Sequence, residues 1–359
     1  MLIRTIAVSA VLFSALTLAQ PGTRFKSPLP LGEEAARGEG PARSEPDEVR
    51  PLRWLVHAQN ENGGWGSEAN GAPDVATTSL SGIALLRLGH TPSSGEHREA
   101  TRKALTFVVR AVERAPGPDQ FIEPPGTLPQ RKLGRGIDTF LAAQFLGEAM
   151  KSMPPGEDRR HVQAALQLCV AKIQAAQGKD GSFSHDGWAP VLSSAFATSG
   201  LYAAKDVGVP VAAESLAKSD EYMLKGYDAK SKEFRTEGSA GVALYQAAGV
   251  LGSAQRAGKL NAPSSVAARE HLADEAFVRG FGTYGGEEHV SYMLSTEAFA
   301  KAGGADWSKW SQSIRKRLAA IQREDGTWRG DHCITSTAFC TAASLITLAI
   351  RPASVPRPM

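Results

Sequence analysis

Three stretches of this sequence share one pattern: Gln59-Asn-Glu-Asn-Gly-Gly-Trp65, Gln177-Gly-Lys-Asp-Gly-Ser-Phe183 and Gln322-Arg-Glu-Asp-Gly-Thr-Trp328. Each places a glutamine, three variable residues, a glycine, one variable residue and an aromatic ring in that order. Looser turns with an aromatic residue fit the same register elsewhere. The six aromatic anchors, spaced 44 to 62 residues apart, are Trp65, Phe121, Phe183, Phe234, Tyr284 and Trp328. Recurrence at this period is typical of repeat architectures, so the sequence predicts six copies of one unit.

The segments around each anchor follow a constant order. A helix with one charged and one apolar face precedes the turn, as in residues 160–176 and 308–321. A helix rich in Ala, Gly, Ser and Thr follows, and it is apolar nearly all round, which is typical of a buried helix. These second helices are predicted at residues 76–88, 137–150, 191–204, 239–251, 290–302 and 335–350. We therefore predict an all-α fold, an (α/α)6 toroid of six helical hairpins with the small-residue helices in an inner ring.

The chain before the repeats has the pattern of an export signal followed by a tether. Arg4 precedes an apolar run, and Thr17 and Ala19 are the small residues expected at a cleavage site. We predict a signal peptide at residues 1–19, a disordered, Pro-rich and charged linker at 20–50, the toroid domain at 51–352 and a tail at 353–359. The mature protein is therefore expected to be secreted or periplasmic, without a membrane span.

Composition excludes several classes of protein. The formal net charge of +3 is spread along the chain, so no nucleic-acid-binding face is expected. Three cysteines are too few for a disulfide scaffold.

The paired helices with their Gln-x-x-x-Gly-x-Trp turns resemble the repeats of squalene and hopene cyclases, and the single-toroid size resembles the β subunit of protein prenyltransferases. The resemblance covers about 300 of the 359 residues. It implies a terpenoid cyclase-like toroid with a central cavity for an apolar or polyprenyl-like ligand. Fold alone does not assign an activity, because function depends on the site.

The catalytic signatures of those families are missing. No Asp-x-Asp, the core of the cyclase acid motif, occurs in the sequence. The run from Lys132 to Phe140 is similar to a prenyltransferase run, but its zinc aspartate and cysteine would fall on Arg135 and Ile137. Neither residue can replace them as a zinc ligand.

Polar residues recur where the inner helices are expected to begin. If the six N-terminal ends share one rim of the ring, these residues gather there, in a place that also favours anions. The predicted rim residues are Asp74, Arg135, Asp138, Glu237, Glu287, Glu288, His289, Asp331, His332 and Cys333. Five of them, Asp74, Arg135, Asp138, Glu237 and Glu288, are candidates for contact with a substrate or an anion.

Three interpretations of the last two units remain open. Glu287, His289, His332 and Cys333 offer carboxylate, imidazole and thiolate, the ligands that a zinc site uses. Asp331, His332 and Cys333 are catalytic candidates, with a thiol of lowered pKa at a helix N-terminus acting as nucleophile. The third interpretation is capping of helix ends by the acidic residues.

Two functions are compatible with these features. The first is an exported toroid that holds a small apolar or polyprenyl-like ligand, with metal-assisted chemistry at the rim. The second is a non-catalytic binding or scaffold module that holds a protein partner. An open cavity with convergent polar groups favours the first, and a centre filled by side chains favours the second.

Overall fold

The structure is a computed structural model of the chain, and it describes residues 45–67, 71–117, 119–183 and 186–351. The predicted signal peptide, most of the predicted linker and the predicted tail lie outside these residues. Contacts within the chain separate a first unit, Met1–Pro41, from a second, Ala42–Met359, and all described residues belong to the second. None of the helices within the described residues is both long and apolar enough to span a bilayer.

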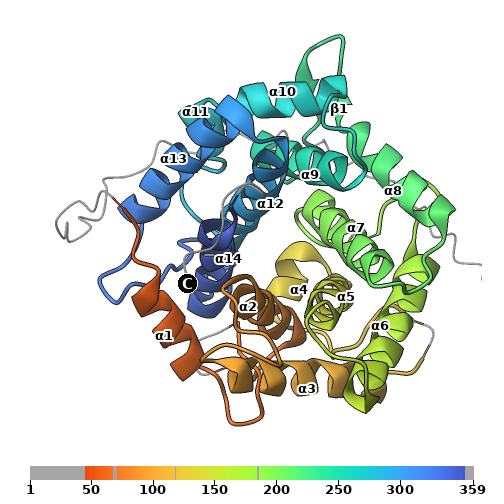
Figure 1. Ribbon diagram of the computed structural model, residues 1–359. Coiled ribbons are helices and arrows are strands. Elements are labelled where there is room, and N and C mark those ends of the chain that lie inside the picture. Colours follow the sequence, from red (N-terminus) through yellow and green to blue (C-terminus); the bar gives the residue numbers. More distant parts are fainter. Residues whose placement is uncertain (1–44, 68–70, 118, 184–185, 352–359) are drawn as a thin grey trace, which may run out of the picture. The chain divides into compact units, whose positions relative to one another are not determined.

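Six helices form a closed inner ring. They are α2 (Val75–Arg87), α5 (Ile137–Met150), α7 (Pro190–Asp206), α9 (Ala243–Arg256), α12 (Gly286–Ala302) and α14 (Thr337–Ala349). Each contacts the next in this order, and α14 contacts α2, so the ring closes (Figure 1). Small residues let these helices approach closely; twelve of the thirteen residues of α2 are buried.

Six further helices surround this ring. They are α1 (Val49–His57), α3 (Arg98–Arg114), α6 (Glu157–Ala176), α8 (Ala213–Leu224), α10 (Pro263–Leu272) and α13 (Gly304–Ala320). Each outer helix packs against the inner helix of the preceding hairpin, and α1 packs against α14. Figure 1 shows the outer helices around the inner ones. The predicted all-α (α/α)6 toroid is thereby confirmed for this unit.

Short elements complete the hairpins. Helix α4 (Leu128–Leu133) precedes α5, and α11 (Glu275–Val278) precedes α12. Strands β1 (Tyr227–Asp228) and β2 (Glu233–Phe234) pair antiparallel before α9, with Tyr227 opposite Phe234. The fourth inner helix was predicted to begin at residue 239, but it begins at Ala243. Residues 239–241 instead form a turn in which Ala240 has a φ of 55°.

The recurrent spacing of the Gln-x-x-x-Gly-x-Trp turn has a structural cause. Nε2 of Gln59 donates to the carbonyl oxygen of Gly63 (2.9 Å) and to that of Ala100 in the next outer helix (2.9 Å). Gly63 has a φ of 91°, and a Cβ there would lie 2.4 Å from the carbonyl oxygen of Lys103. The turn therefore joins one hairpin to the outer helix of the next.

The aromatic residue of the turn is tied to its own hairpin. Nε1 of Trp65 donates to the Leu55 carbonyl (2.7 Å), and its amide donates to Oγ1 of Thr78 (2.9 Å). Trp328 repeats both bonds with Leu318 (2.9 Å) and Thr341 (3.1 Å). Each tryptophan thus bridges the end of an outer helix and the start of an inner one.

The predicted linker ends earlier than residue 50. Nε2 of Gln322 donates to the Asp47 carbonyl (2.7 Å), as the other turn glutamines do to the next outer helix. Arg315 pairs with Glu45 (2.8 Å) and Glu48 (2.9 Å). Residues 45–50 therefore join the last hairpin to the first. Their hydrogen-bond and ion-pair partners lie near the other end of the chain, so the local sequence does not reveal them.

Replacing the buried turn ring tests its role in the hairpin. Trp65 is 1% exposed, and we expect Trp65→Ala to lower the free energy of unfolding by about 3–5 kcal/mol through loss of packing. The measurement is urea unfolding. The matched control is Trp188→Ala, at a ring that is 63% exposed, with an expected change within about 1 kcal/mol. Equal losses in both variants would contradict the role of the turn.

Candidate functional site

The inner helices run parallel, so the ring has two chemically different ends. The amide of Ala76 in α2 donates to Asp138 in α5, and the amide of Gly286 in α12 donates to the Ile334 carbonyl in the loop before α14. We call the first turns of the six inner helices and the loops before them the N-terminal rim. The last turns of the same helices, with the residues that cap them, form the C-terminal rim.

At the N-terminal rim, three carboxylates converge on the first turn of α2. Oδ1 of Asp74 accepts from the Thr77 amide (2.7 Å), and Oδ1 of Asp138 accepts from the Ala76 amide (3.0 Å). The Val75 amide donates to Glu123. The three consecutive orphan amides of the helix start are therefore each satisfied by a different acid.

The burial and mutual proximity of these three acids raise their pKa values. Burial, together with the charges of Asp74 and Glu123, raises the pKa of Asp138 to about 8. Burial and the charge of Asp74 raise the pKa of Glu123 to about 7, and burial also raises the pKa of Asp74. Carboxylates that share a poorly solvated site cannot all ionise together without a large cost. The cluster therefore holds protons at neutral pH.

Helix α4 lies over this cluster. Nε2 of Gln130 donates to Oδ2 of Asp138 (2.7 Å), and α4 packs against α5 and α7. Lys132, also on α4, is close enough to α12 for its charge to oppose the raised pKa of Glu287. Figure 1 shows α4 within the ring of inner helices. Asp74 and Asp138, each 1% exposed, are thus shielded from solvent. Glu123 is the one of the three carboxylates that is partly exposed.

A second polar group surrounds the start of α12. Oε2 of Glu288 accepts from the Gly285 amide (2.8 Å), and the Tyr245 hydroxyl donates to Oε1. Nε2 of His332 lies 3.5 Å from Oε2 of Glu288 and 3.2 Å from the Thr283 carbonyl oxygen. Burial raises the pKa of Glu288. Glu288 is therefore the acid on which this group is centred.

The remaining candidates point to different partners. Oε2 of Glu287 accepts from the Ile334 amide (3.3 Å), and the thiol of Cys333 hydrogen-bonds to Glu287. Nδ1 of His289 lies 2.9 Å from Oγ of Ser344, inside the helix packing. Burial raises the pKa of Glu287 to about 7 and lowers that of His289 to about 3.

The predicted zinc ligands do not form a set. In the part of the chain that the structure describes, no three His, Cys, Asp or Glu side chains are grouped so that they could hold a metal ion. His332 faces Glu288, Cys333 faces Glu287, and His289 faces Ser344. The four predicted residues, Glu287, His289, His332 and Cys333, are thus divided among three environments, and we assign no zinc to them.

The predicted nucleophile is not supported by the local electrostatics. Burial and the charge of Glu287 raise the pKa of Cys333 to about 11, whereas a lowered value was expected from a helix N-terminus. The reason is that α14 begins only at Thr337, with Ser336 as its N-cap, so Cys333 precedes the helix. Asp331 is exposed, and its amide donates to the Tyr284 carbonyl (2.6 Å). The catalytic interpretation of Asp331, His332 and Cys333 therefore gains no support here.

Two other predicted rim residues have separate surroundings. The guanidinium of Arg135 lies over the ring of Phe121, 3.8 Å from its centroid, and the Arg135 amide donates to Asp186 (3.2 Å). Glu237 is exposed in the loop before α9.

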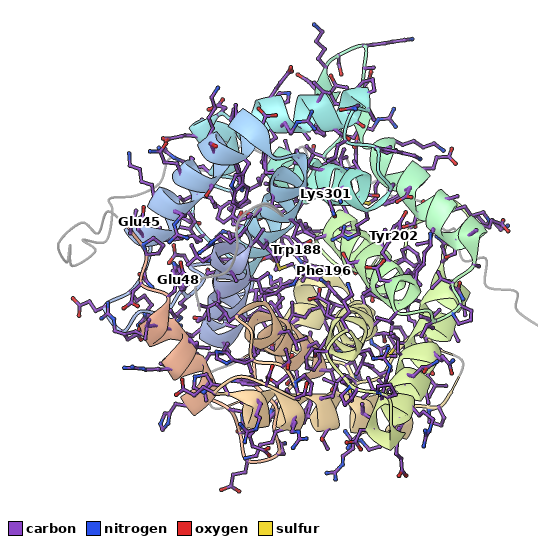
Figure 2. All side chains as sticks on the ribbon, in the orientation of Figure 1. Glu45, Glu48, Trp188, Phe196, Tyr202 and Lys301 are labelled. Carbon is purple, nitrogen blue, oxygen red and sulfur yellow. The ribbon has the colours of Figure 1, made fainter. Side chains whose placement is uncertain are left out.

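The N-terminal rim also exposes two aromatic rings, Trp188 (63%) and Phe281 (58%). Figure 2 labels Trp188 near the centre of the ring in projection.

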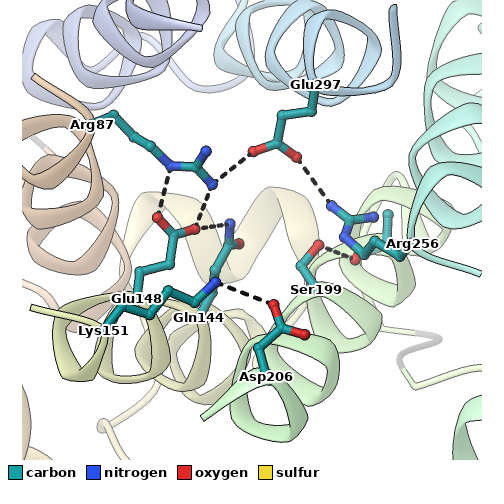
Figure 3. Close-up of polar contacts among 9 residues, drawn as sticks. Arg87, Gln144, Glu148, Lys151, Ser199, Asp206, Arg256 and Glu297 are labelled. Atoms are coloured by element: carbon teal, nitrogen blue, oxygen red, sulfur yellow. Dashed lines mark hydrogen bonds and ion pairs between the residues drawn. The ribbon is translucent and has the colours of Figure 1, made fainter. Parts of the chain in front are cut away.

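The C-terminal rim carries an ion network that the sequence did not predict. Arg87 binds Glu148 through two bonds of 2.7 Å and Glu297 through one of 3.2 Å. Arg256 pairs with the other oxygen of Glu297 (3.4 Å). These residues come from four different inner helices and meet at the ring axis (Figure 3). Arg87 holds the pKa of Glu148 below its usual value even though burial opposes this.

This network lines a cavity of about 330 Å³, which we call the axial chamber. All six inner helices contribute to its wall, α14 through its C-cap Ile350. The chamber is lined by Arg87, Gln144, Glu148, Lys151, Ser199, Tyr202, Ala203, Asp206, Gln255, Arg256, Glu297, Ala300, Lys301, Ile350 and Arg351. A signal for it existed in the sequence, because Arg87, Glu148 and Glu297 are charged residues in the C-terminal halves of inner helices that are rich in apolar and small residues.

The fold is an α/α toroid, and it is shared with solved structures of a type II terpene cyclase and a glycosidase. No protein-family model and no curated protein sequence matches this chain. Among solved structures, the type II terpene cyclase MstE from Scytonema aligns with a TM-score of 0.54 at 14% identity, over 84% of this chain and 96% of that one.

Two other structures align almost as well. An MstE variant in complex with its substrate, geranylgeranyl dihydroxybenzoate, has a TM-score of 0.52 at 15% identity, over 84% of this chain and 95% of its own. A glycosidase variant in complex with glucose has a TM-score of 0.52 at 11% identity, with the same coverage. At these identities the likeness establishes the shared fold.

The proton-sharing carboxylates at α2 predict a pH dependence of stability. A carboxyl whose pKa is higher in the folded state holds its proton more tightly there, so its contribution is present at low pH and is lost as pH rises through the folded pKa. For Glu123 that loss begins near the ordinary carboxyl pKa of 4.5 and is complete just above the folded pKa of about 7. Glu123→Gln keeps an oxygen for the Val75 amide but cannot ionise. We expect the variant to gain stability relative to wild type between pH 5 and pH 8, measured by urea unfolding.

The matched control for this experiment is Glu237→Gln, at an exposed carboxylate of the same rim. It should follow the wild-type pH profile. If Glu123→Gln also keeps the wild-type pH profile, Glu123 does not share protons with Asp74 and Asp138.

Proposed function

We propose that this chain is an exported, non-catalytic binding module that holds a small polar molecule in the axial chamber. The observation that carries the proposal is the position of the chamber on the ring axis, where the ends of all six inner helices supply its wall. Concave sites with a few convergent polar groups are where proteins most often bind small molecules. Export rests on the sequence pattern at residues 1–19, which the structure does not describe.

The chemistry of the chamber favours a polar ligand over the apolar or polyprenyl-like ligand predicted from the resemblance. Its wall contains the ion pairs of Arg87 with Glu148 and Glu297, which an apolar ligand would desolvate without compensation. Two buried polar atoms in the same wall, Nη1 of Arg256 and Oε1 of Gln144, have no hydrogen-bond partner within the described residues. Both atoms belong to residues that line the chamber, so its wall carries polar groups whose hydrogen bonding the protein does not complete.

Two acids of the opposite rim are already engaged within the protein. Asp74 and Asp138 accept hydrogen bonds from helix amides, and α4 covers them. MstE is described with a geranylgeranyl substrate and the glycosidase with glucose, so toroids of this fold accept both apolar and polar molecules. The choice for this chain therefore depends on its own chamber wall, which is polar.

A protein partner remains a second candidate. Trp188 and Phe281 are large rings exposed on the N-terminal rim, and exposed aromatic residues are enriched where proteins bind one another. This surface is independent of the axial chamber, so both activities are compatible in one molecule.

Filling the chamber tests the proposal. Ala300 lies in its wall and is 9% exposed, so Ala300→Phe places a ring in the cavity. A panel of sugars, hydroxy acids, amino acids and phosphorylated compounds, beside a panel of prenyl alcohols, is screened by thermal shift and then by calorimetry. We expect a polar compound to bind the wild type and to lose at least about tenfold in affinity in the variant, which is about 1.4 kcal/mol.

The matched control is Ala302→Phe, at the exposed end of the same helix and outside the chamber wall. It should bind as the wild type does. The proposal fails if only prenyl alcohols bind, if nothing in the polar panel binds, or if Ala300→Phe binds as tightly as Ala302→Phe.

A further inference from the structure

The charges around the axial chamber are unequal. Five cationic side chains, Arg87, Lys151, Arg256, Lys301 and Arg351, line it, together with the three carboxylates of Glu148, Asp206 and Glu297. Charges taken out of water need a partner of opposite sign, because the loss of hydration is costly. The carboxylate partner of each cation therefore shows whether the protein itself balances the positive charges of the chamber wall.

Four of the five cations have carboxylate partners. Arg87 and Arg256 share Glu297, and Arg87 also binds Glu148. Lys151 lies 3.1 Å from Asp206, and Arg351 lies 3.6 Å from Glu48, outside the chamber wall.

Lys301 is the exception. It lies in the last turn of α12, is exposed, and pairs with no carboxylate among the residues that the structure describes. Figure 2 labels it close to the ring centre in projection. It gives the chamber one positive charge that the protein does not balance locally.

Arg256 supplies a second, independent observation. Its side chain is 9% exposed, and its Nη2 donates to Oε2 of Glu297 (3.4 Å). Nη1 is buried and has no acceptor within the described part of the chain. The guanidinium of Arg256, a residue that lines the chamber, therefore has a donor nitrogen that the protein does not satisfy, although burial makes such a donor costly to leave unpaired.

We propose that the axial chamber binds a small oxyanion, a carboxylate or phosphate group, between the guanidinium of Arg256 and the ammonium of Lys301. This inference rests on the proposed binding function and adds the chemical class of the ligand. Guanidinium and ammonium groups are the common protein partners of both anions, since charge-assisted bonds to them are short and strong. The unbalanced charge of Lys301 fits a ligand group that carries at least one negative charge.

Helix dipoles alone do not account for these cations. The C-terminal ends of parallel helices carry partial negative charge and attract basic residues, which accounts for Lys205 in the last turn of α7. Dipole attraction, however, requires neither the convergence of Arg87 and Arg256 on one carboxylate nor a buried guanidinium nitrogen without an acceptor. Lys205 is outside the chamber wall, which makes it a matched control for charge at this rim.

The test uses the mature chain with inorganic phosphate, acetate and chloride at equal ionic strength, by thermal shift and calorimetry. We expect phosphate or acetate at millimolar concentration to raise the melting temperature in a saturable way and chloride to have no such effect. The two oxyanions distinguish a phosphate ligand from a carboxylate ligand. Lys301→Gln, at an exposed position that the fold does not need, should weaken this binding at least about fivefold, whereas Lys205→Gln should bind as the wild type does.

Three outcomes would overturn the inference: no saturable response to either oxyanion, a response to chloride of the same size, or equal binding by Lys301→Gln and Lys205→Gln. A neutral polar compound that binds the wild type and is lost in Ala300→Phe, without any oxyanion response, would remove the anion inference and leave the proposed function standing. No response to oxyanions or to the polar panel would remove both.

Discussion

Six inner helices pack in parallel around one axis, and the chemistry of both rims follows from that packing. Each hairpin runs from an outer helix through a glycine-aromatic turn into an inner helix, so every inner helix points the same way. Their dipoles add, which places partial positive charge at one rim and partial negative charge at the other. Acids at the first rim, such as Asp74 and Glu288, and bases at the second, such as Arg87 and Lys301, are the side chains that this field favours.

The charged side chains are arranged differently at the two rims. At the N-terminal rim, more carboxylates gather than the helix starts can keep ionised, so Glu123 and Asp138 have raised pKa values, and α4 covers the group. At the C-terminal rim, long basic and acidic side chains reach across the axis to one another. Small residues close the ring in its middle, whereas these long side chains surround a polar chamber at its end.

Ring closure depends on a bond that repeats at the turns. Gln59 and Gln177 each donate to the next outer helix, and Gln322 donates to the Asp47 carbonyl just before α1. The last repeat is therefore joined to the first by the same contact that joins successive repeats. This explains why the folded part extends to residues that look like a linker in composition, including Glu45 and Glu48.

Local sequence was enough to predict the repeat, the six hairpins and the division into inner and outer helices, because Gln-x-x-x-Gly-x-Trp turns and helix composition act over short distances. It also placed Asp74 and Glu288 at one rim, because parallel helices begin together. Contacts between distant segments, which the sequence does not reveal, give the neighbouring side chains of His332 and Cys333 different partners. They also bring Arg87 to Glu297. The physical reason is that an inner helix apolar on every side has no polar face to fix its rotation, so packing against its neighbours determines what faces the axis.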